Sequence, residues 1–380
     1  MKKLKILLAI SLLCLSTFSI SVFAVSTEPV ESLKGTNGKT VKVIHQESVK
    51  VSDSILEMML KNAKDAIAEE KSKTNQAEKN ASNNGTTYDY VTFDEDNYYF
   101  YEESLNSDPE LIVYDIDQQD IAVQVQSFDS TITPMATQTD FISDGVGGKQ
   151  KVTKTGTSGS YLSTQMTLPT SSQVSTDLTK YAPYNYGGFE YTLSGNNGIG
   201  SWAADMGLQL YNNLGPQSNA SGWKPLIVLK KKIGIDSWQQ YSIIFPDTLH
   251  QEGQYHNGYK PGSAPVMYFW YNYNGKVRMK VDGTTICPTR HGTTLADTHN
   301  ITIMESSSSC NLSQITTWKL LSTVVSTDNT GKNKAVFSNI KVDGVAVSST
   351  YFPTPEQDHA SVTRSSNNVT IVVDSSIYQF

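Results

Sequence analysis

The segment best suited to binding a ligand is rich in aromatic residues: positions 265–273 read PVMYFWYNY. Such a short apolar run is typical of a β-strand, whose successive side chains point to opposite faces. Tyr268 and Trp270 then share one face. The other face carries Met267, Phe269, Tyr271 and Tyr273. A sandwich strand needs only one apolar face for the core. Tyr268 and Trp270 are therefore predicted to stack on sugar rings, the alternative being a second small core beneath loops.

Three further aromatic residues are candidates for the same binding role. Tyr184, Tyr186 and Trp202 stand in segments that we interpret as loops, where binding groups commonly lie. We therefore predict Tyr186 and Trp202 as additional ligand-binding residues.

Two residues are candidates for catalysis. A glycoside hydrolase needs a pair of carboxylates, and Glu190 lies on a predicted strand but has no acidic residue two or four positions later. His256 lies in a Gly-rich segment, HQEGQYHNGYKPG, and histidine is the usual general base near neutral pH. Solvated side chains without a catalytic role are the alternative for both residues.

The cysteines that remain after a leader is removed, Cys287 and Cys310, are predicted to form a disulfide. The loop of about two dozen residues between them would give roughly 3 kcal/mol of stabilisation. Zinc bound with His291 and His299 is the alternative, but the spacing fits no compact zinc module. We predict no metal site and no cofactor.

The first 24 residues predict a secretory signal peptide. Lys2, Lys3 and Lys5 precede a short apolar run, and residues 22–24 end in Ala24, after which cleavage is expected. We therefore expect a secreted, extracellular protein. No later apolar run is long enough to span a membrane.

Charge divides the rest of the chain in two. Residues 25–136 carry 9 Lys and 21 Asp or Glu, a net charge of −12, whereas residues 137–380 carry 18 basic and 16 acidic residues, a net charge of +2. This contrast indicates two units. The acidic balance makes a nucleic-acid partner unfavourable, because phosphate binding needs clustered Lys and Arg.

The acidic region, 25–136, predicts a small α+β unit. Its helix spans 51–73, with a narrow apolar stripe of Ile55, Met59, Ala63 and Ile67. A polar linker is expected over 72–87 and strand-rich segments over 88–128. The unit is interpreted either as a propeptide cleaved near residues 133–137 or as a domain that stays attached.

Residues 137–380 predict an antiparallel β-sandwich of the jelly-roll type. Short alternating segments follow one another with turn signals between them, and Asn274-Gly275 is a strong hairpin signal. The predicted strands are 161–168, 188–193, 206–211, 226–231, 241–245, 266–273, 276–281, 301–304, 317–323, 335–342 and 369–373.

Residues 334–345 (KAVFSNIKVDGV) look like a late strand and turn, and with the layout of this second region they resemble the concanavalin A-like jelly-roll class of lectins and glucanases. Three further motifs are Gly187–Tyr191 (GGFEY), Gly207–Leu210 (GLQL) and Phe337–Ile340 (FSNI). With these motifs, residues 138–380 more closely resemble the uncharacterised secreted YrpD-like proteins of Gram-positive bacteria. It implies a fold and an exterior location, and no mechanism.

These features together predict a secreted, lectin-like protein that binds an extracellular or cell-wall polysaccharide. A polysaccharide-cleaving enzyme on the same fold is the first alternative. A structural or matrix protein is the second.

Overall fold

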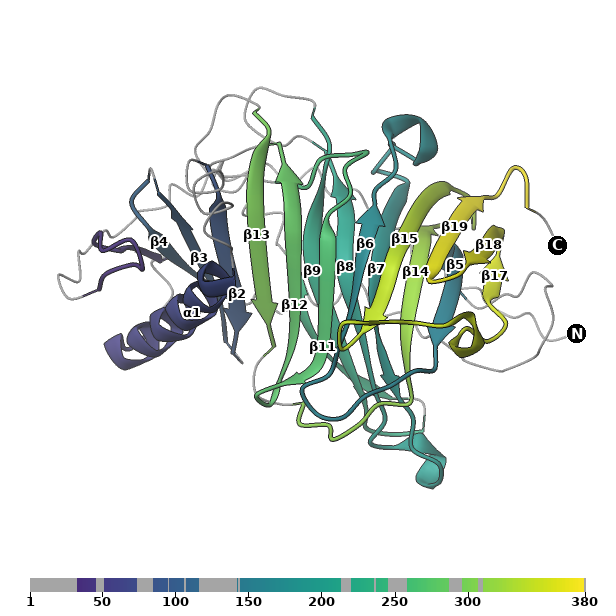
Figure 1. The fold of residues 1–380 in the computed structure, drawn as a ribbon, viewed down its shortest axis with the longest axis horizontal. Helices are drawn as coiled ribbons and strands as arrows, with labels where there is room; N and C mark the ends of the chain where they lie inside the picture. Colours follow the sequence, from purple (N-terminus) through teal and green to yellow (C-terminus); the bar gives the residue numbers. More distant parts are fainter. Residues whose placement is uncertain are drawn as a thin grey trace, which may run out of the picture.

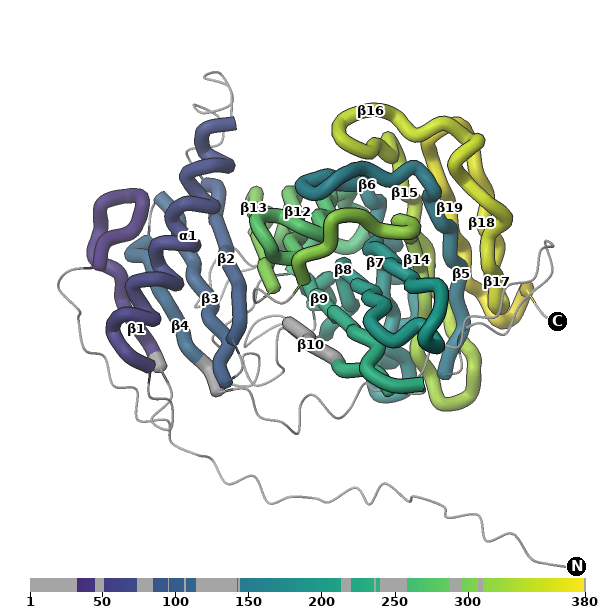
Figure 2. The backbone as a smooth tube through the Cα atoms, turned by 90° about the horizontal axis from the view of Figure 1, so that it is seen from below, coloured from purple at the N-terminus to yellow at the C-terminus, as the bar shows by residue number. Residues whose placement is uncertain are grey.

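Two β-sheets pack face to face, and the larger one continues sideways into a unit built from N-terminal residues (Figure 1, Figure 2). This arrangement is seen in a computed structural model of the chain. The structure describes residues 33–45, 51–73, 85–94, 96–105, 107–115, 142, 144–212, 220–235, 237–244, 258–286, 296–306 and 310–378.

Over these residues the smaller sheet has seven strands in the order β10-β9-β8-β7-β14-β5-β17, all antiparallel. They are β5 (Gly145–Val152), β7 (Tyr181–Tyr191), β8 (Trp202–Tyr211), β9 (Gly222–Lys232), β10 (Trp238–Ile244), β14 (Thr317–Ser326) and β17 (Glu356–Asp358).

The larger sheet has twelve strands in the described residues, in the order β1-β4-β3-β2-β13-β12-β11-β6-β15-β19-β18, with β16 beside β15. Its N-terminal strands are β1 (Lys42–His45), β2 (Thr87–Phe93), β3 (Asn97–Ser104) and β4 (Glu110–Asp115). The others are β6 (Tyr161–Thr167), β11 (Val266–Tyr273), β12 (Lys276–Thr285), β13 (Thr298–Glu305), β15 (Lys332–Val342), β16 (Val345–Ala346), β18 (Ala360–Ser365) and β19 (Asn368–Asp374). The pairs β1–β4 and β2–β13 are parallel.

The main core lies between the two sheets. Phe269 and Met267 of β11 are fully buried there with Trp318 of β14 and Trp223 of β9. Space between the sheets is tight at Gly187 of β7, where an added Cβ would lie 2.7 Å from a ring carbon of Phe269. The sandwich predicted from the sequence is therefore the observed fold, a mainly β protein with a small α+β region at its N-terminal side.

The N-terminal residues form a four-stranded segment of the large sheet with helix α1 (Asp53–Lys73) on it (Figure 1). The predicted helix over 51–73 is confirmed, and its apolar stripe is wider than predicted. Its buried residues are Leu56, Met59, Leu60, Ala63, Ala66, Ile67 and Glu70. The apolar residues of this set, all except Glu70, form a second core with the outward side chains of β2–β4 and with Ile301 and Ile303 of β13. Val91 of β2 and Phe100 of β3 also belong to the main core, so the N-terminal unit and the sandwich share one sheet and both core clusters.

Local sequence signals agree with the structure at the hairpin between β11 and β12. Asn274 and Gly275 have φ angles of 53° and 88°, so both central residues have the positive φ that a type I′ hairpin turn requires, and the predicted hairpin is confirmed. The segments around Tyr184, Tyr186 and Trp202 were wrongly interpreted as loops: these residues lie in β7 and β8. The other helical pieces in the described part of the chain are the 3₁₀ turns η2 (Ser171–Gln173), η3 (Asn196–Gly198) and η4 (Ser349–Tyr351).

Several predictions lie outside the described residues. They are the signal peptide over 1–24, residues 74–84 of the polar linker predicted over 72–87, the segment 116–128 and the cleavage region 133–137. The two ends of the predicted linker were wrong, because Ser72 and Lys73 belong to α1 and Thr87 begins β2. Among the helices that the structure does describe, none has the length and apolar character needed to cross a membrane.

Candidate functional site

An aromatic cluster lies on the outer face of the large sheet, at strands β6 and β11. Tyr268 and Trp270 of β11 stack with ring centroids 5.8 Å apart and an interplanar angle of 15°. Tyr161 of β6 contacts both, at 6.0 Å from Tyr268 and 5.4 Å from Trp270. The sequence pattern correctly placed Tyr268 and Trp270 together on one face, because their neighbours Met267 and Phe269 face the core.

The three rings differ in how much of each is accessible. Trp270 is only 8% exposed and forms the centre of the cluster. Tyr161 and Tyr268 are half-buried, so part of each ring faces outward. Any ligand that stacks here would therefore contact the two tyrosines first, with Trp270 supporting them from the sheet.

Tyr273 was predicted on the core face of β11, and the structure corrects this. The register of the β11–β12 ladder shifts between Trp270 and Tyr273. Such an irregularity reverses the alternation of side chains. Tyr273 therefore turns outward, where its ring meets Trp270 edge-on at 5.6 Å.

Two cations of β12 lie over these rings. The Lys280 ammonium is 4.2 Å from the centroid of Tyr268, and the Arg278 guanidinium is 5.5 Å from Trp270 and 4.1 Å from Tyr273. Both cations are nearly buried. A cation at this distance from a ring face is attracted by the negative π-face. We call Tyr161, Tyr268, Trp270, Tyr273, Arg278 and Lys280 the aromatic–cationic face.

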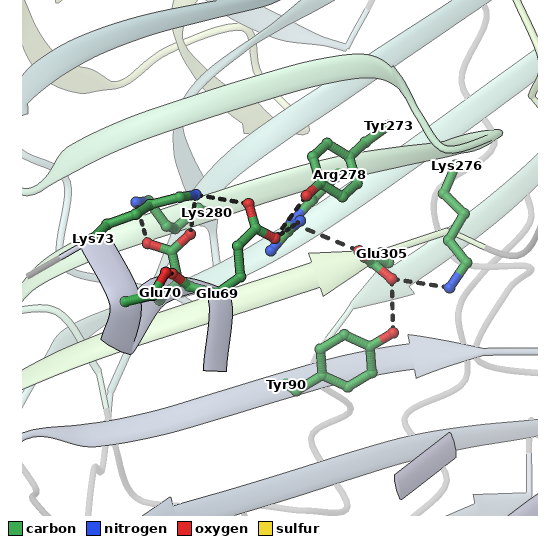
Figure 3. Close-up of polar contacts among 10 residues, drawn as sticks. Glu69, Glu70, Lys73, Tyr90, Tyr273, Lys276, Arg278, Lys280 and Glu305 are labelled. Atoms are coloured by element: carbon green, nitrogen blue, oxygen red, sulfur yellow. Dashed lines mark hydrogen bonds and ion pairs between the residues drawn. The ribbon is translucent and has the colours of Figure 1, made fainter. Parts of the chain in front are cut away.

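The last turns of α1 cover part of this face with carboxylates (Figure 3). Glu70 accepts a hydrogen bond from Lys280 at 2.7 Å, and Glu69 accepts from Arg278 at 3.2 Å and from the Tyr273 hydroxyl at 2.6 Å. Lys73 bridges both glutamates from the solvent side. Desolvation works against ionisation of Glu69, but the hydrogen bonds and the positive charges outweigh it and hold its pKa at about 2.

A third carboxylate, Glu305 of β13, extends the ionic contacts along the sheet. It lies 3.6 Å from Arg278 Nε and 2.9 Å from Lys276, and it accepts a hydrogen bond from the buried Tyr90 hydroxyl at 2.7 Å (Figure 3). Burial and the Glu305 charge both raise the pKa of Tyr90 well above its ordinary value. Tyr90 therefore keeps its hydroxyl proton and donates a hydrogen bond that links β2 to β13.

The other two predicted binding residues lie elsewhere. Tyr186 is on the outer face of the small sheet, in an apolar cluster with Tyr184, Leu226 and Leu321. Trp202 points inward and is part of the main core. The structure thus brings Tyr268 and Trp270 together and places Tyr186 and Trp202 at two other sites.

Glu190 is held in an ionic network on the outer face of the small sheet. Lys149 lies 3.2 Å and Lys151 3.4 Å from its carboxylate, and both lysines also contact Glu356. Burial disfavours the charged form, but the lysine charges outweigh it and hold the pKa of Glu190 at about 2. The group is therefore ionised at neutral pH and cannot act there as a proton donor. His256 lies outside the described residues.

The predicted disulfide is not formed in the structure. Cys310 is a free, buried thiol, and burial raises its pKa to about 12; Cys287 lies outside the described residues. His299, named in the zinc alternative, instead contacts Asp282 at 2.7 Å and Thr86 at 3.0 Å. No cluster of three metal-ligating side chains occurs among the residues with described positions.

Sequence reasoning missed Tyr161, Arg278 and Lys280 as members of the face. Alternation within 276–281 (KVRMKV) does place Arg278 and Lys280 on one side of a strand, so a signal was present. The carboxylates of α1 had no comparable signal, because about 210 residues separate Glu70 from Lys280.

Residues 139–373 match a family model described as "Domain of unknown function, YrpD". The chain belongs to the YrpD family. It is also similar to the uncharacterised protein YrpD of Bacillus subtilis (strain 168), with 29% identity over 238 residues. The aligned residues cover 61% of this chain and 83% of that protein. The matched region contains the aromatic–cationic face, whereas α1 and β1–β4 precede it.

Solved structures offer only a weak likeness. Scytalido-glutamic peptidase bound to a transition-state analogue inhibitor aligns with a TM-score of 0.32 and 11% identity, over 60% of this chain and 97% of that one. SCP-B, an eqolisin-family peptidase bound to a tripeptide, aligns with a TM-score of 0.29, 11% identity and the same coverage. Similarity at this level supports no functional argument.

Proposed function

We propose that the protein binds an extracellular or cell-wall polysaccharide on its aromatic–cationic face. The observation that carries this proposal is the contact of Tyr161, Tyr268 and Trp270 on the outside of a sheet whose inner face already supplies the core. Sugar rings present C–H faces that pack against aromatic rings. Two half-buried tyrosines supported by a tryptophan supply such a surface.

Polar side chains beside the rings suit the hydroxyl groups of a sugar. Lys341 of β15 is exposed and pairs in register with the buried Ser163 of β6, which in turn pairs with Tyr268. Gln165 lies two residues further along β6 and is exposed. Ligand sites commonly combine apolar contact area with a few such polar groups.

The resemblance to the concanavalin A-like class and the signal peptide predicted over 1–24 support the same proposal, since both fit a lectin-like protein outside the cell. The cleavage alternative has less support in the described residues. The lysines around Glu190 keep its carboxylate ionised, so it lacks the raised pKa that a general acid needs.

Binding to a panel of insoluble cell-wall polysaccharides, measured by co-sedimentation, tests this function. Tyr268→Ala should lower the affinity for the retained polymer by about tenfold, which corresponds to the 1–1.5 kcal/mol of one aromatic contact. Trp238→Ala, which removes an exposed aromatic ring from the small sheet, should leave binding unchanged. An unchanged affinity in Tyr268→Ala, or no binding across the panel, would contradict the proposal.

A further inference from the structure

The cations of the aromatic–cationic face belong to the matched family domain, whereas the carboxylates that pair with them precede it. Lys280 and Arg278 lie on β12 within residues 139–373, and Glu69 and Glu70 lie on α1. The two parts of the chain also differ in charge, at −12 for residues 25–136 and +2 for residues 137–380. The acidic segment therefore places carboxylates on the cations of this face, as an acidic ligand would do.

The contact is buried and specific. The side chains of Lys280 and Glu70 are 8% and 4% exposed, and their charged atoms lie 2.7 Å apart. Glu69 meets Arg278 and the Tyr273 hydroxyl together. Each carboxylate thus pairs with a cation that lies over an aromatic ring: Glu69 with Arg278, which lies over Tyr273, and Glu70 with Lys280, which lies over Tyr268.

Arg278 retains hydrogen-bonding capacity that the described residues do not use. Its side chain is 2% exposed, and Nη2 is buried without a hydrogen-bond acceptor in the described part of the chain. Glu69 engages Nη1 alone. A guanidinium binds a carboxylate best through two parallel N–H donors, so Glu69 fills this position incompletely.

Resting on the proposed function, we propose that the face recognises a uronate-bearing, acidic polysaccharide, and that Glu69 and Glu70 of α1 compete with the ligand for it. Ligand carboxylates would take the places of Glu69 and Glu70 on Arg278 and Lys280. The sugar rings would pack on Tyr268 and Tyr161. The N-terminal unit then lowers the affinity of the full chain for its own ligand.

The experiment compares two polymers with the same backbone, polygalacturonate and its fully methyl-esterified, neutral form. Affinities are measured for the full chain, for E69Q/E70Q and for the control E57Q, which removes one charge from an exposed position of α1. Intrinsic tryptophan fluorescence checks that each sandwich is folded, since all five tryptophans lie between positions 202 and 318.

Replacing the competing carboxylates should raise the affinity for polygalacturonate at least about fivefold, the lower end of typical coupling between sites. E57Q should not do so. If α1 leaves the sheet in E69Q/E70Q, the affinity for polygalacturonate should also rise, because the aromatic–cationic face is then uncovered. K280M should remove the preference for polygalacturonate over its ester.

Equal effects of E69Q/E70Q and E57Q would overturn the inference, and so would an unchanged preference in K280M. Binding of both polymers with the same affinity, lost in Tyr268→Ala, would overturn the acidic ligand while leaving the proposed function intact. Absence of any Tyr268-dependent polysaccharide binding would overturn both.

Discussion

The ion pair between Glu70 and Lys280 gives a quantitative test of how α1 is held on the sheet. Both side chains are nearly buried, at 4% and 8% exposed, and the charged atoms are 2.7 Å apart. Removing one partner of a buried pair leaves an uncompensated charge, which typically costs about 3–5 kcal/mol. An exposed pair on the same helix, Lys61–Asp65, is worth only about 0.3–0.5 kcal/mol.

The structure predicts unequal effects for the two partners. In E70Q, the contact that Lys280 keeps among the described residues is its position over the Tyr268 ring, worth about 1 kcal/mol, so we expect a loss of about 3 kcal/mol. In K280M, Glu70 keeps Lys73 at 2.9 Å, and we expect a loss of about 1–2 kcal/mol. The double variant E70Q/K280M should cost clearly less than the sum, because no charge is left unpaired.

Urea denaturation with two probes measures these changes in the free energy of unfolding. Tryptophan fluorescence reports on the sandwich, and the helical signal in far-UV circular dichroism reports on α1. D65N is the matched control for an exposed pair on the same helix and should change the free energy by less than about 0.5 kcal/mol. A loss below about 1 kcal/mol in E70Q by both probes would refute the reasoning, since the pair would then behave as a surface contact.

Two further predictions concern the small sheet and the core. Glu190 has a pKa of about 2 against an ordinary 4.5, so its ionic network stabilises the protein fully above pH 4.5. About 3 kcal/mol of stability should be lost as the pH falls from 4.5 to about 2, and thermal melting of E190Q should be less pH-dependent over this range. Gly187→Ala would place a methyl group 2.7 Å from the Phe269 ring and should cost about 1–3 kcal/mol, part of it recovered in G187A/F269L. Gly85→Ala, which has open space around it, should be nearly neutral in the same unfolding assay; equal costs at both glycines would contradict the packing argument.

Much of the fold could be predicted because its signals are local. The period of Ile55, Met59, Ala63 and Ile67 identified α1, and alternation with turn residues identified the sandwich. β5 was missed because its sequence, GVGGKQKV, has glycines where strands usually have β-branched residues. Close packing against β14 explains the first of these glycines, because an added Cβ at Gly145 would lie 2.1 Å from a backbone oxygen of Val324.

The candidate site could be predicted only in part. Alternation gave the shared face of Tyr268 and Trp270, but the bulge that turns Tyr273 outward has no sequence signature in this strand. The placement of Tyr186 and Trp202 depended on mistaking strands for loops. The coverage of the face by α1 arises from tertiary packing between distant segments, which a single sequence does not reveal.

The parallel ladder between β2 and β13 has a consequence for the solubility of the family domain. Pairing over 300–304 satisfies the outward backbone groups of β13. A domain without the N-terminal strands would leave β13 as an open sheet edge, and such an edge can recruit strands from other molecules. Pairing with β2 therefore removes this edge of the sandwich as a site for edge-to-edge contacts, a consequence separate from any ligand.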